Sequence, residues 1–193
     1  MTTYVALLRA VNVGGTGKLS MADLTALCTE IGFDRVETYI ASGNVVFDSG
    51  LAAGTVQSRL EQRLLAHAGR AIGVIVRTAE EIKRVHEANP FADQQPNLTY
   101  AFFLPAKPAA DALHDLRGRA GEEIRLGTRE IYVYYPSGMG QSKLRIPAAS
   151  VGTARNLNTV ARLVAMSSRN LRDDGGGGRG SGGGGGRRGA NQR

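Results

Sequence analysis

The chain has 193 residues, 42% of them apolar, and a formal charge of +7 from 24 Lys and Arg against 17 Asp and Glu. Such a length suits one or two folded units of about 100–200 residues each. Its single cysteine excludes an intrachain disulfide framework, and no stretch approaches the roughly 20 apolar residues of a membrane span. The first apolar run has no basic segment before it, unlike a secretory signal. We therefore expect a soluble protein of the cytoplasm.

The charge and the glycines are unevenly distributed along the chain. Residues 173–193 hold four Arg, two Asp and 11 of the 26 Gly, so residues 1–172 keep 20 basic and 15 acidic residues and a charge of +5. The tail has neither hydrophobic periodicity nor enough apolar surface to offset its chain entropy. We expect a disordered tail and a body that is mildly basic in its own right.

Hydrophobic patterns over residues 1–78 predict a β-α-β-β-α-β order. Ser20 followed by Asp23 resembles a helix capping box, and Gly32 is typical of the residue that ends a helix. The predicted elements are a strand over 4–11, a helix over 21–31, a hairpin of strands over 36–40 and 44–48, a helix from about 56 to Gly69 and a strand over 72–77. This order is typical of the ferredoxin-like fold.

The second half of the chain predicts a looser unit of the same kind. Asn89-Pro90 can stop its first helix, and Thr153 is placed to cap its last. A last strand is not obvious, although Ile146 or residues 150–151 could supply a short one. The predicted elements are helices over 79–88, 108–117 and 141–145, strands over 99–104, 123–126 and 130–135, and a final helix that begins after Thr153. The whole pattern predicts an α+β fold of two ferredoxin-like halves with antiparallel sheets, residues 1–78 and 79–172, and the disordered tail over 173–193.

Five segments share a pattern that goes beyond secondary structure. They are TYVALLRAVNVGGTGKLSMADL and VETYIASGNVVFDS near the N-terminus, ANPF at 88–91, SKL at 142–144 and TARNLNTVARL at 153–163. In this order they resemble the domain of unknown function (DUF) 1697 family. The resemblance implies two α+β ferredoxin-like halves and carries no established activity. This chain departs from the family pattern at Leu157, where an aromatic residue is expected, in having no Trp, and in its Gly/Arg-rich tail.

The glycine-rich loop over residues 12–18 lies between a predicted strand and a predicted helix, where phosphates are often bound. Its candidate binding residues are Asn12 and Lys18. It is not a Walker A loop, because Asn12 stands at the first glycine position and Leu19 follows Lys18. The alternative is a flexible connection whose glycines allow positive φ. Ser42 and Asn44, in the predicted hairpin, are further and less specific candidates.

The start of the last helix is the best candidate anion site in the sequence. If Thr153 caps this helix, Arg155, Asn156 and Asn158 lie in its first turns, where free N–H groups and the helix dipole favour an anion. Arg155 would bind a phosphate or carboxylate through two hydrogen bonds. The remaining candidates are Ser142, Lys143 and Thr159. The alternative is that Asn156 and Thr159 bind neighbouring backbone groups.

No catalytic constellation is recognisable, so the sequence leaves open whether the protein is an enzyme. Cys28 lies on the apolar stripe of a helix, where a buried thiol is inert. The pair Glu122-Glu123 is interpreted as exposed charge. One cysteine and three scattered histidines leave no zinc spacing, and we expect neither a metal nor a cofactor.

Basicity favours a polyanionic partner. The first hypothesis is a non-catalytic protein that associates with nucleic acid, RNA or single-stranded DNA rather than duplex, through Arg155, Lys143 and the tail residues Arg179, Arg187 and Arg188. The alternative is a protein or enzyme that binds a small anion, such as a phosphorylated metabolite, at the start of the last helix. The sequence does not determine the oligomeric state.

Overall fold

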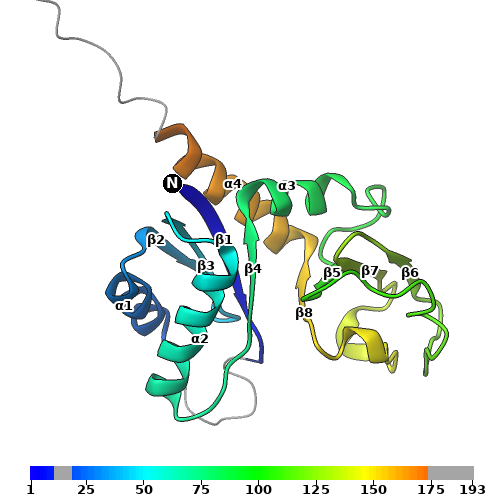
Figure 1. Cartoon of the computed structure of the whole chain (residues 1–193). Helices are drawn as coiled ribbons and strands as arrows, with labels where there is room; N and C mark the ends of the chain where they lie inside the picture. The colour runs from blue at the N-terminus through cyan, green and yellow to red at the C-terminus, as the bar shows by residue number, and fades with distance from the viewer. Residues whose placement is uncertain (11–18, 174–193) are drawn as a thin grey trace, which may run out of the picture.

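The computed structural model describes residues 1–10 and 19–173 (Figure 1). Within these residues the chain has an α+β fold with four α-helices and two antiparallel four-stranded sheets. None of these helices is both long and apolar enough to cross a bilayer. The end of the first predicted strand, the candidates Asn12 and Lys18, and the tail from residue 174 lie outside the described residues.

The first sheet has the β-α-β-β-α-β order that the sequence predicts. Its elements are β1 (Thr2–Leu8), α1 (Met21–Ile31), β2 (Asp34–Tyr39), β3 (Asn44–Ser49), α2 (Ala53–Ala68) and β4 (Val74–Thr78). The strands lie in the order β2-β3-β1-β4, and each neighbouring pair is antiparallel. The predicted capping box at the start of α1 is present, because Ser20 and Asp23 bind each other's backbone N–H groups. Gly32 ends the helix with φ 91°, a conformation that glycine adopts without strain.

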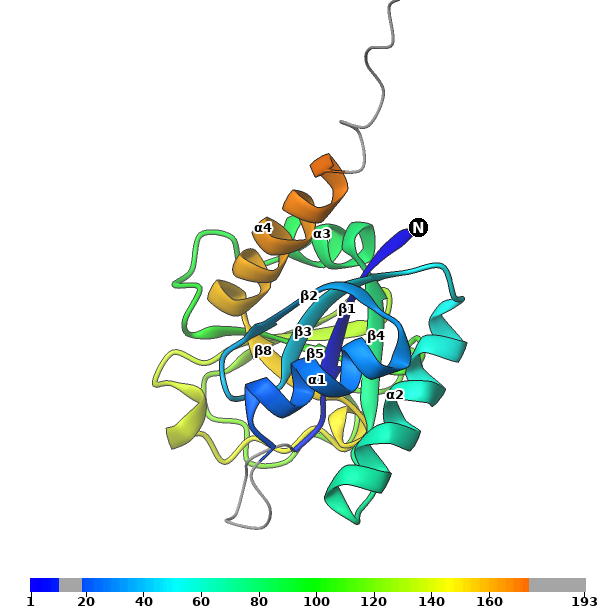
Figure 2. The same cartoon turned by 90° about the vertical axis from the view of Figure 1, so that its left-hand side faces the viewer.

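Each face of the first sheet buries a different set of side chains. On β1, Tyr4, Ala6 and Leu8 point toward α1 and α2, which cover one face of the sheet (Figure 2). Val5 and Leu7 point to the opposite face and pack against the second half of the chain. Because successive side chains of a strand alternate between faces, a strand buried on both faces is apolar throughout. This accounts for the unbroken apolar run at the N-terminus.

The second sheet repeats the strand order of the first with different connections. Its elements are α3 (Ala79–Glu87), β5 (Thr99–Phe103), β6 (Glu123–Leu126), β7 (Glu130–Tyr134), β8 (Thr153–Asn156) and α4 (Leu157–Asp173). The strands lie in the order β6-β7-β5-β8, so each lies where its counterpart does in the first sheet. The two α-helices, however, come before and after the four strands rather than between them. The β-α-β-β-α-β order is therefore observed in the first half alone.

The predicted helix over residues 108–117 is wrong. Residues 110–115 form turns, with short-range bonds such as Ala112 N–H to Ala109 O and His114 N–H to Asp111 O. Leu113 and Leu116 are only half-buried, so a helix here would gain little packing to offset its nucleation cost. In addition, Arg117 at the end of this segment forms an antiparallel bridge with Arg145.

The structure also differs from the prediction over residues 141–157. Residues 153–156 form β8, which pairs with β5, and α4 begins at Leu157 rather than directly after Thr153. The strands expected at Ile146 or 150–151, and the short helix over 141–145, are not formed; 3-10 turns occupy Met139–Gln141 and Pro147–Ala149. The reason is tertiary: the free edge of β5 is paired by β8, which sequence-local patterns do not indicate.

Helices α3 and α4 pack against each other and connect the two sheets (Figure 1). A shared core lies between the halves, with residues from the first sheet, from both helices and from the second sheet. It includes Val5, Leu7 and Ile75 from the first sheet, Ile82 and Val85 from α3, Phe103 and Tyr132 from the second sheet, and Val160 and Leu163 from α4.

Candidate anion-binding site

Arg155, the central residue of the predicted site, is buried between the two halves. It lies on β8 with 6% of its surface exposed. Its guanidinium donates to Asn44 Oδ1 at 2.6 Å, Thr153 Oγ1 at 2.7 Å, and the carbonyls of Leu8 and Ser42 at 2.9 Å each. Burial lowers its pKa to about 10. The prediction that Arg155 binds a ligand at a helix start is therefore wrong, because its donors are used within the protein.

The neighbours of Arg155 have separate roles. Asn156 Oδ1 accepts from the backbone N–H of Thr159 at 2.9 Å, so Asn156 caps α4. Thr159 is buried and Asn158 is exposed. The capping alternative is thus what the structure contains, and these three residues do not converge with Arg155 on an anion site.

The weaker candidates of the hairpin belong to the junction between the halves. Asn44 is fully buried, and its Nδ2 donates to Tyr39 O at 2.9 Å and to Ser42 Oγ at 3.0 Å. Ser42 is exposed, but its carbonyl accepts from Arg155. The structure therefore brings Ser42, Asn44 and Arg155 together in a packed contact rather than in a binding site. The tail candidates Arg179, Arg187 and Arg188 lie outside the described residues.

Ser142 and Lys143 line a pocket of about 340 Å³ beside the second sheet. Ser142 Oγ donates to the carboxylate of Glu122 and accepts from Leu144 N–H at 3.0 Å. The other carboxylate oxygen of Glu122 accepts from Ala120 N–H at 2.5 Å. The Ser142 hydroxyl, and next the Ala120 amide, hold the pKa of Glu122 below its usual value. Glu122 was expected to be exposed, and this is wrong: 4% of it is exposed.

Four exposed cations lie on two segments that contribute to this pocket and pair with each other, and Lys143 is the one of the four that lines it. Arg117 and Arg145 form an antiparallel bridge, with N–H to O distances of 3.1 and 2.8 Å. Gly118, the residue after Arg117, has φ 69°, and a Cβ on it would lie 2.3 Å from the Lys143 carbonyl oxygen. The pairing therefore requires glycine at this position. We call the exposed residues Arg117, Arg119, Lys143 and Arg145 the basic rim.

The basic rim forms few contacts with the rest of the described residues, one of them from Arg119 Nε to the Glu122 carbonyl at 2.8 Å. None of its four side chains forms an ion pair with any described residue. The sequence analysis found only Lys143 of the four. The sequence contains a signal for Arg145, because charged and apolar residues alternate in Lys143-Leu144-Arg145-Ile146, and in the structure Leu144 and Ile146 are the buried ones. This alternation is typical of an extended chain, whereas the segment was interpreted as a helix.

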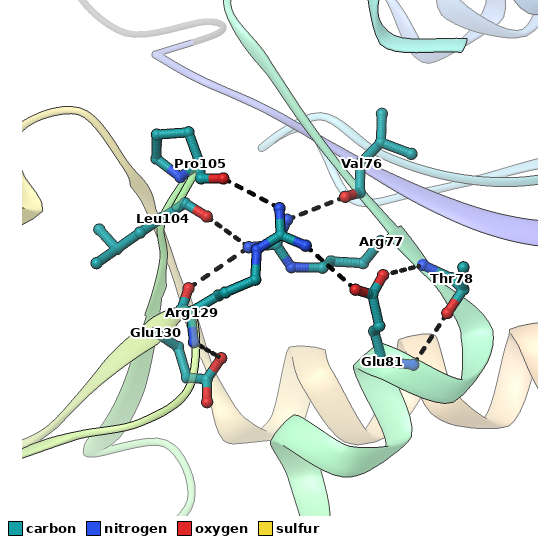
Figure 3. A network of polar contacts seen from close by, with 8 residues as sticks. All are labelled: Val76, Arg77, Thr78, Glu81, Leu104, Pro105, Arg129 and Glu130. Atoms are coloured by element: carbon teal, nitrogen blue, oxygen red, sulfur yellow. Dashed lines mark hydrogen bonds and ion pairs between the residues drawn. The ribbon is translucent and has the colours of Figure 1, made fainter. Parts of the chain in front are cut away.

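A second buried arginine joins the halves at β4, an edge strand of the first sheet (Figure 3). Arg77, on β4, is 2% exposed and donates to the carbonyls of Leu104 and Val76, the latter at 3.0 Å. Burial, and next the charge of Arg129, lowers its pKa to about 10. Arg129 itself donates to Glu81 Oε1 at 3.2 Å. No local pattern in the sequence indicates this network, because its members come from both halves.

The described residues include one cysteine and three histidines, which are side chains used in metal and nucleophilic sites. No three His, Cys, Asp or Glu side chains there are close enough together to hold a metal ion. Cys28 is fully buried, and burial raises the pKa of its thiol to about 12. A thiol in this environment stays protonated and is not a nucleophile at neutral pH.

Residues 1–132 match the family model described as "Protein of unknown function (DUF1697)". The chain belongs to this family. A solved structure, that of conserved bacterial protein SP0830 from Streptococcus pneumoniae, is similar to this chain with a TM-score of 0.71 and 24% identity, over 86% of this chain and 98% of the other. At this identity the likeness shows the fold. No curated protein matches the chain.

The DUF1697 resemblance stated from the sequence segments is thus confirmed. Two of those segments lie at features described above. The SKL segment at 142–144 contributes Ser142 and Lys143 to the pocket, and the start of the segment at 153–163 forms β8. The family description assigns no activity, so function has to be argued from the pocket and the basic rim.

Proposed function

We propose that the protein binds a small phosphate-bearing molecule, without catalysis, in the pocket beside the basic rim. The observation that carries the proposal is that the exposed Lys143 lines a concave site of about 340 Å³, and that Arg117, Arg119 and Arg145 are exposed on the same two segments as its lining residues. That volume lies within the range of about 300–1,000 Å³ typical of small-molecule sites. Arginine and lysine together suit phosphate, since arginine binds it through two parallel hydrogen bonds and lysine acts as a point charge.

The electrostatics of the pocket are consistent with an anionic ligand. Glu122 is the one carboxylate among the lining residues, and Ser142 Oγ and the Ala120 amide already bind it. Its carboxylate oxygens are therefore bonded within the pocket wall, and of the rim cations the charge of Arg119 acts on it. Lys143 is exposed and lines the pocket directly. The site differs from the one expected at the start of the last helix, where Arg155 is buried.

The test is a titration with inorganic phosphate and pyrophosphate, followed by isothermal calorimetry and by thermal stabilisation. Wild type is expected to show saturable binding, and the double variant Arg119→Gln, Lys143→Gln to lose affinity at least about tenfold. Lys83→Gln is the charge-matched control, since Lys83 is exposed on α3 and paired with Glu87 at 3.8 Å. Absence of saturable binding, or equal affinities in wild type and the double variant, would overturn the proposal.

A second candidate is association with RNA or single-stranded DNA. Its support is that the basic rim is exposed on two segments, and that the whole chain carries a charge of +7. Arg155 no longer supports this candidate as a phosphate contact, because its side chain is buried. A mobility-shift titration at low salt should show binding to single strands that falls steeply with salt and weakens in the double variant. No shift with either single-stranded or duplex nucleic acid would rule it out.

We infer further that residues 1–78 form a ferredoxin-like unit and residues 79–172 a second unit with the same strand order, in a cytoplasmic protein. The support is the shared relative order of strands in the two sheets. In the second unit the connection between β5 and β6 has turns in place of a helix, and it supplies Arg117 and Arg119. On this view Arg117 and Arg119 lie in the connection that corresponds to the one containing α1 in the first unit.

A further inference from the structure

A second pocket of about 350 Å³ lies beside the first. Tyr135 lines both pockets. The segment from Met139 to Ile146 also borders both, since Ser142 and Lys143 line the first pocket and Leu144 and Ile146 line the second. The two pockets are therefore neighbours on one side of the second sheet, with the same short segment between them.

The second pocket differs from the first in its chemistry. Its other apolar lining residues are Phe102, Met139, Pro147 and Ala149. Arg145, a member of the basic rim, is its one charged lining residue, and the Arg145 side chain is exposed and forms no ion pair with a described residue. The apolar pocket thus has a cation of the rim in its wall.

This arrangement is complementary to a molecule with two different ends. An apolar group transferred from water into such a pocket gains free energy in proportion to the apolar area removed from water. A phosphate attached to that group would be held near Arg145 and Lys143, where the cations can donate to it. Neither end alone would use both features.

We propose that the apolar pocket holds the aryl or alkyl group of the same ligand whose phosphate lies at the basic rim, so that the ligand class is a phosphate monoester of an apolar alcohol. The inference rests on the proposed function, because it takes the phosphate position from it. It adds the chemistry of the rest of the ligand. It also assigns Arg145 to both ends of the site.

The experiment compares 1-naphthyl phosphate, inorganic phosphate and 1-naphthol by calorimetry on the full chain. The naphthyl phosphate is expected to bind at least about tenfold more tightly than phosphate, since burial of its ring adds to the same ionic contacts. It is also expected to bind more tightly than 1-naphthol, which lacks the anion. An affinity for naphthyl phosphate no higher than that for phosphate, or equal to that for naphthol, would overturn the inference.

Two variants locate the aryl group. Ser150 is exposed at the second pocket, and Ser150→Trp would fill it while leaving the Ser150 carbonyl to accept from Arg9. Met139→Gln keeps the length of the side chain and makes the wall polar. Both should remove most of the advantage of naphthyl phosphate over phosphate. The matched control is Ser58→Trp, at an exposed serine in a separate pocket beside α2, which should keep that advantage.

The titrations with phosphate and with naphthyl phosphate distinguish failure of the proposed function from failure of the further inference. Inorganic phosphate contains no aryl group, so its loss of affinity in Arg119→Gln, Lys143→Gln tests the proposed function alone. If phosphate binding depends on the rim but the advantage of naphthyl phosphate survives in both Ser150→Trp and Met139→Gln, the further inference fails while the proposed function stands. If phosphate binding does not depend on the rim, the proposed function fails first.

Discussion

The arginines of this protein fall into two groups that lie in opposite environments. Arg77 and Arg155 are buried at the junction of the halves, and each guanidinium donates to backbone carbonyls of residues distant in sequence. Arg117, Arg119 and Arg145 are exposed at the basic rim without ion pairs to described residues. The same side chain therefore serves as a structural connector in one region and as an available cation in the other.

The difference follows from the cost of removing a charge from water. A buried guanidinium has to satisfy its donors within the protein, since an unpaired buried charge is strongly unfavourable. Once satisfied by several carbonyls, it fixes their relative positions and becomes inaccessible to a ligand. A guanidinium in water keeps its hydration and is free to exchange it for a phosphate. Five predictions test this contrast, from the largest expected change in stability to the smallest.

Arg155→Ala should have the largest effect. It removes the donor for Asn44 Oδ1, Leu8 O and Ser42 O, and each buried acceptor left without a partner costs about 1–3 kcal/mol. We expect a fall of about 4 kcal/mol in the free energy of unfolding, measured by urea denaturation. Arg155→Lys should lose less, because one charged donor remains. A loss below about 1 kcal/mol for Arg155→Ala would contradict the connector role.

Arg77→Ala tests the same role at β4, where the other buried arginine lies. It leaves the Leu104 and Arg129 carbonyls without this donor. The expected loss is about 3 kcal/mol, again by urea denaturation. The matched control is Arg84→Ala on α3, whose side chain is 71% exposed and 3.6 Å from Glu80. This control should change stability by less than about 0.5 kcal/mol.

Gly118→Ala should disturb the basic rim through its backbone. The added Cβ would lie 2.3 Å from the Lys143 carbonyl oxygen, at a residue with φ 69°. We expect a loss of about 2 kcal/mol, together with weaker binding of phosphate, because the paired segments have to separate. Gly140→Ala, where a Cβ meets nothing within 4 Å, is the control and should be neutral. Equal stability and binding in the two variants would remove the argument that the pairing positions the cations.

Glu122→Gln has a pH-dependent effect whose sign follows from the lowered pKa. The bonds from Ser142 and Ala120 hold the pKa of Glu122 below its usual 4.5, so the carboxylate adds stability above about pH 4.5 and loses it as the pH falls through the lower, folded value. The difference in unfolding free energy between wild type and the variant should therefore close in acid. Urea denaturation between pH 7 and pH 3 measures it. The neighbour Glu123, 3.8 Å from Arg125 and 47% exposed, provides the charge-matched control Glu123→Gln, which should change stability at pH 7 by less than about 0.5 kcal/mol.

The rim substitutions should affect stability least. Arg119→Gln and Lys143→Gln remove exposed charges without ion pairs to described residues, and such changes usually stay within about 0.5 kcal/mol. Their loss of phosphate affinity should nevertheless be at least about tenfold. Arg155→Lys is the reverse case, with lower stability and unchanged phosphate affinity per folded molecule. A rim variant that unfolds easily would show that these cations are structural as well.

Local signals predicted much of the first half correctly. The Ser20–Asp23 capping box, the stop at Gly32 and the hairpin near residues 41–43 all rest on neighbours within a few residues, and the structure contains each of them. For the candidate site, local signals predicted only some of the residues. Ser142 and Lys143 line a pocket. Arg117, Arg119 and Arg145 were not predicted, because they come together through the bridge between Arg117 and Arg145, which are 28 residues apart in the sequence.

The sequence by itself determined the α+β class, the family, the first β-α-β-β-α-β unit and its helix ends, because capping, turn and periodicity signals act over one or two helical turns. Only the tertiary structure decided where Arg155 lies. Its bond to the Leu8 carbonyl spans 147 positions of the chain, and residues 153–156 become a strand since β5 has an edge to be paired. Edge pairing and burial between halves are properties of the assembled fold, and they turned the expected ligand-binding arginine into a buried connector.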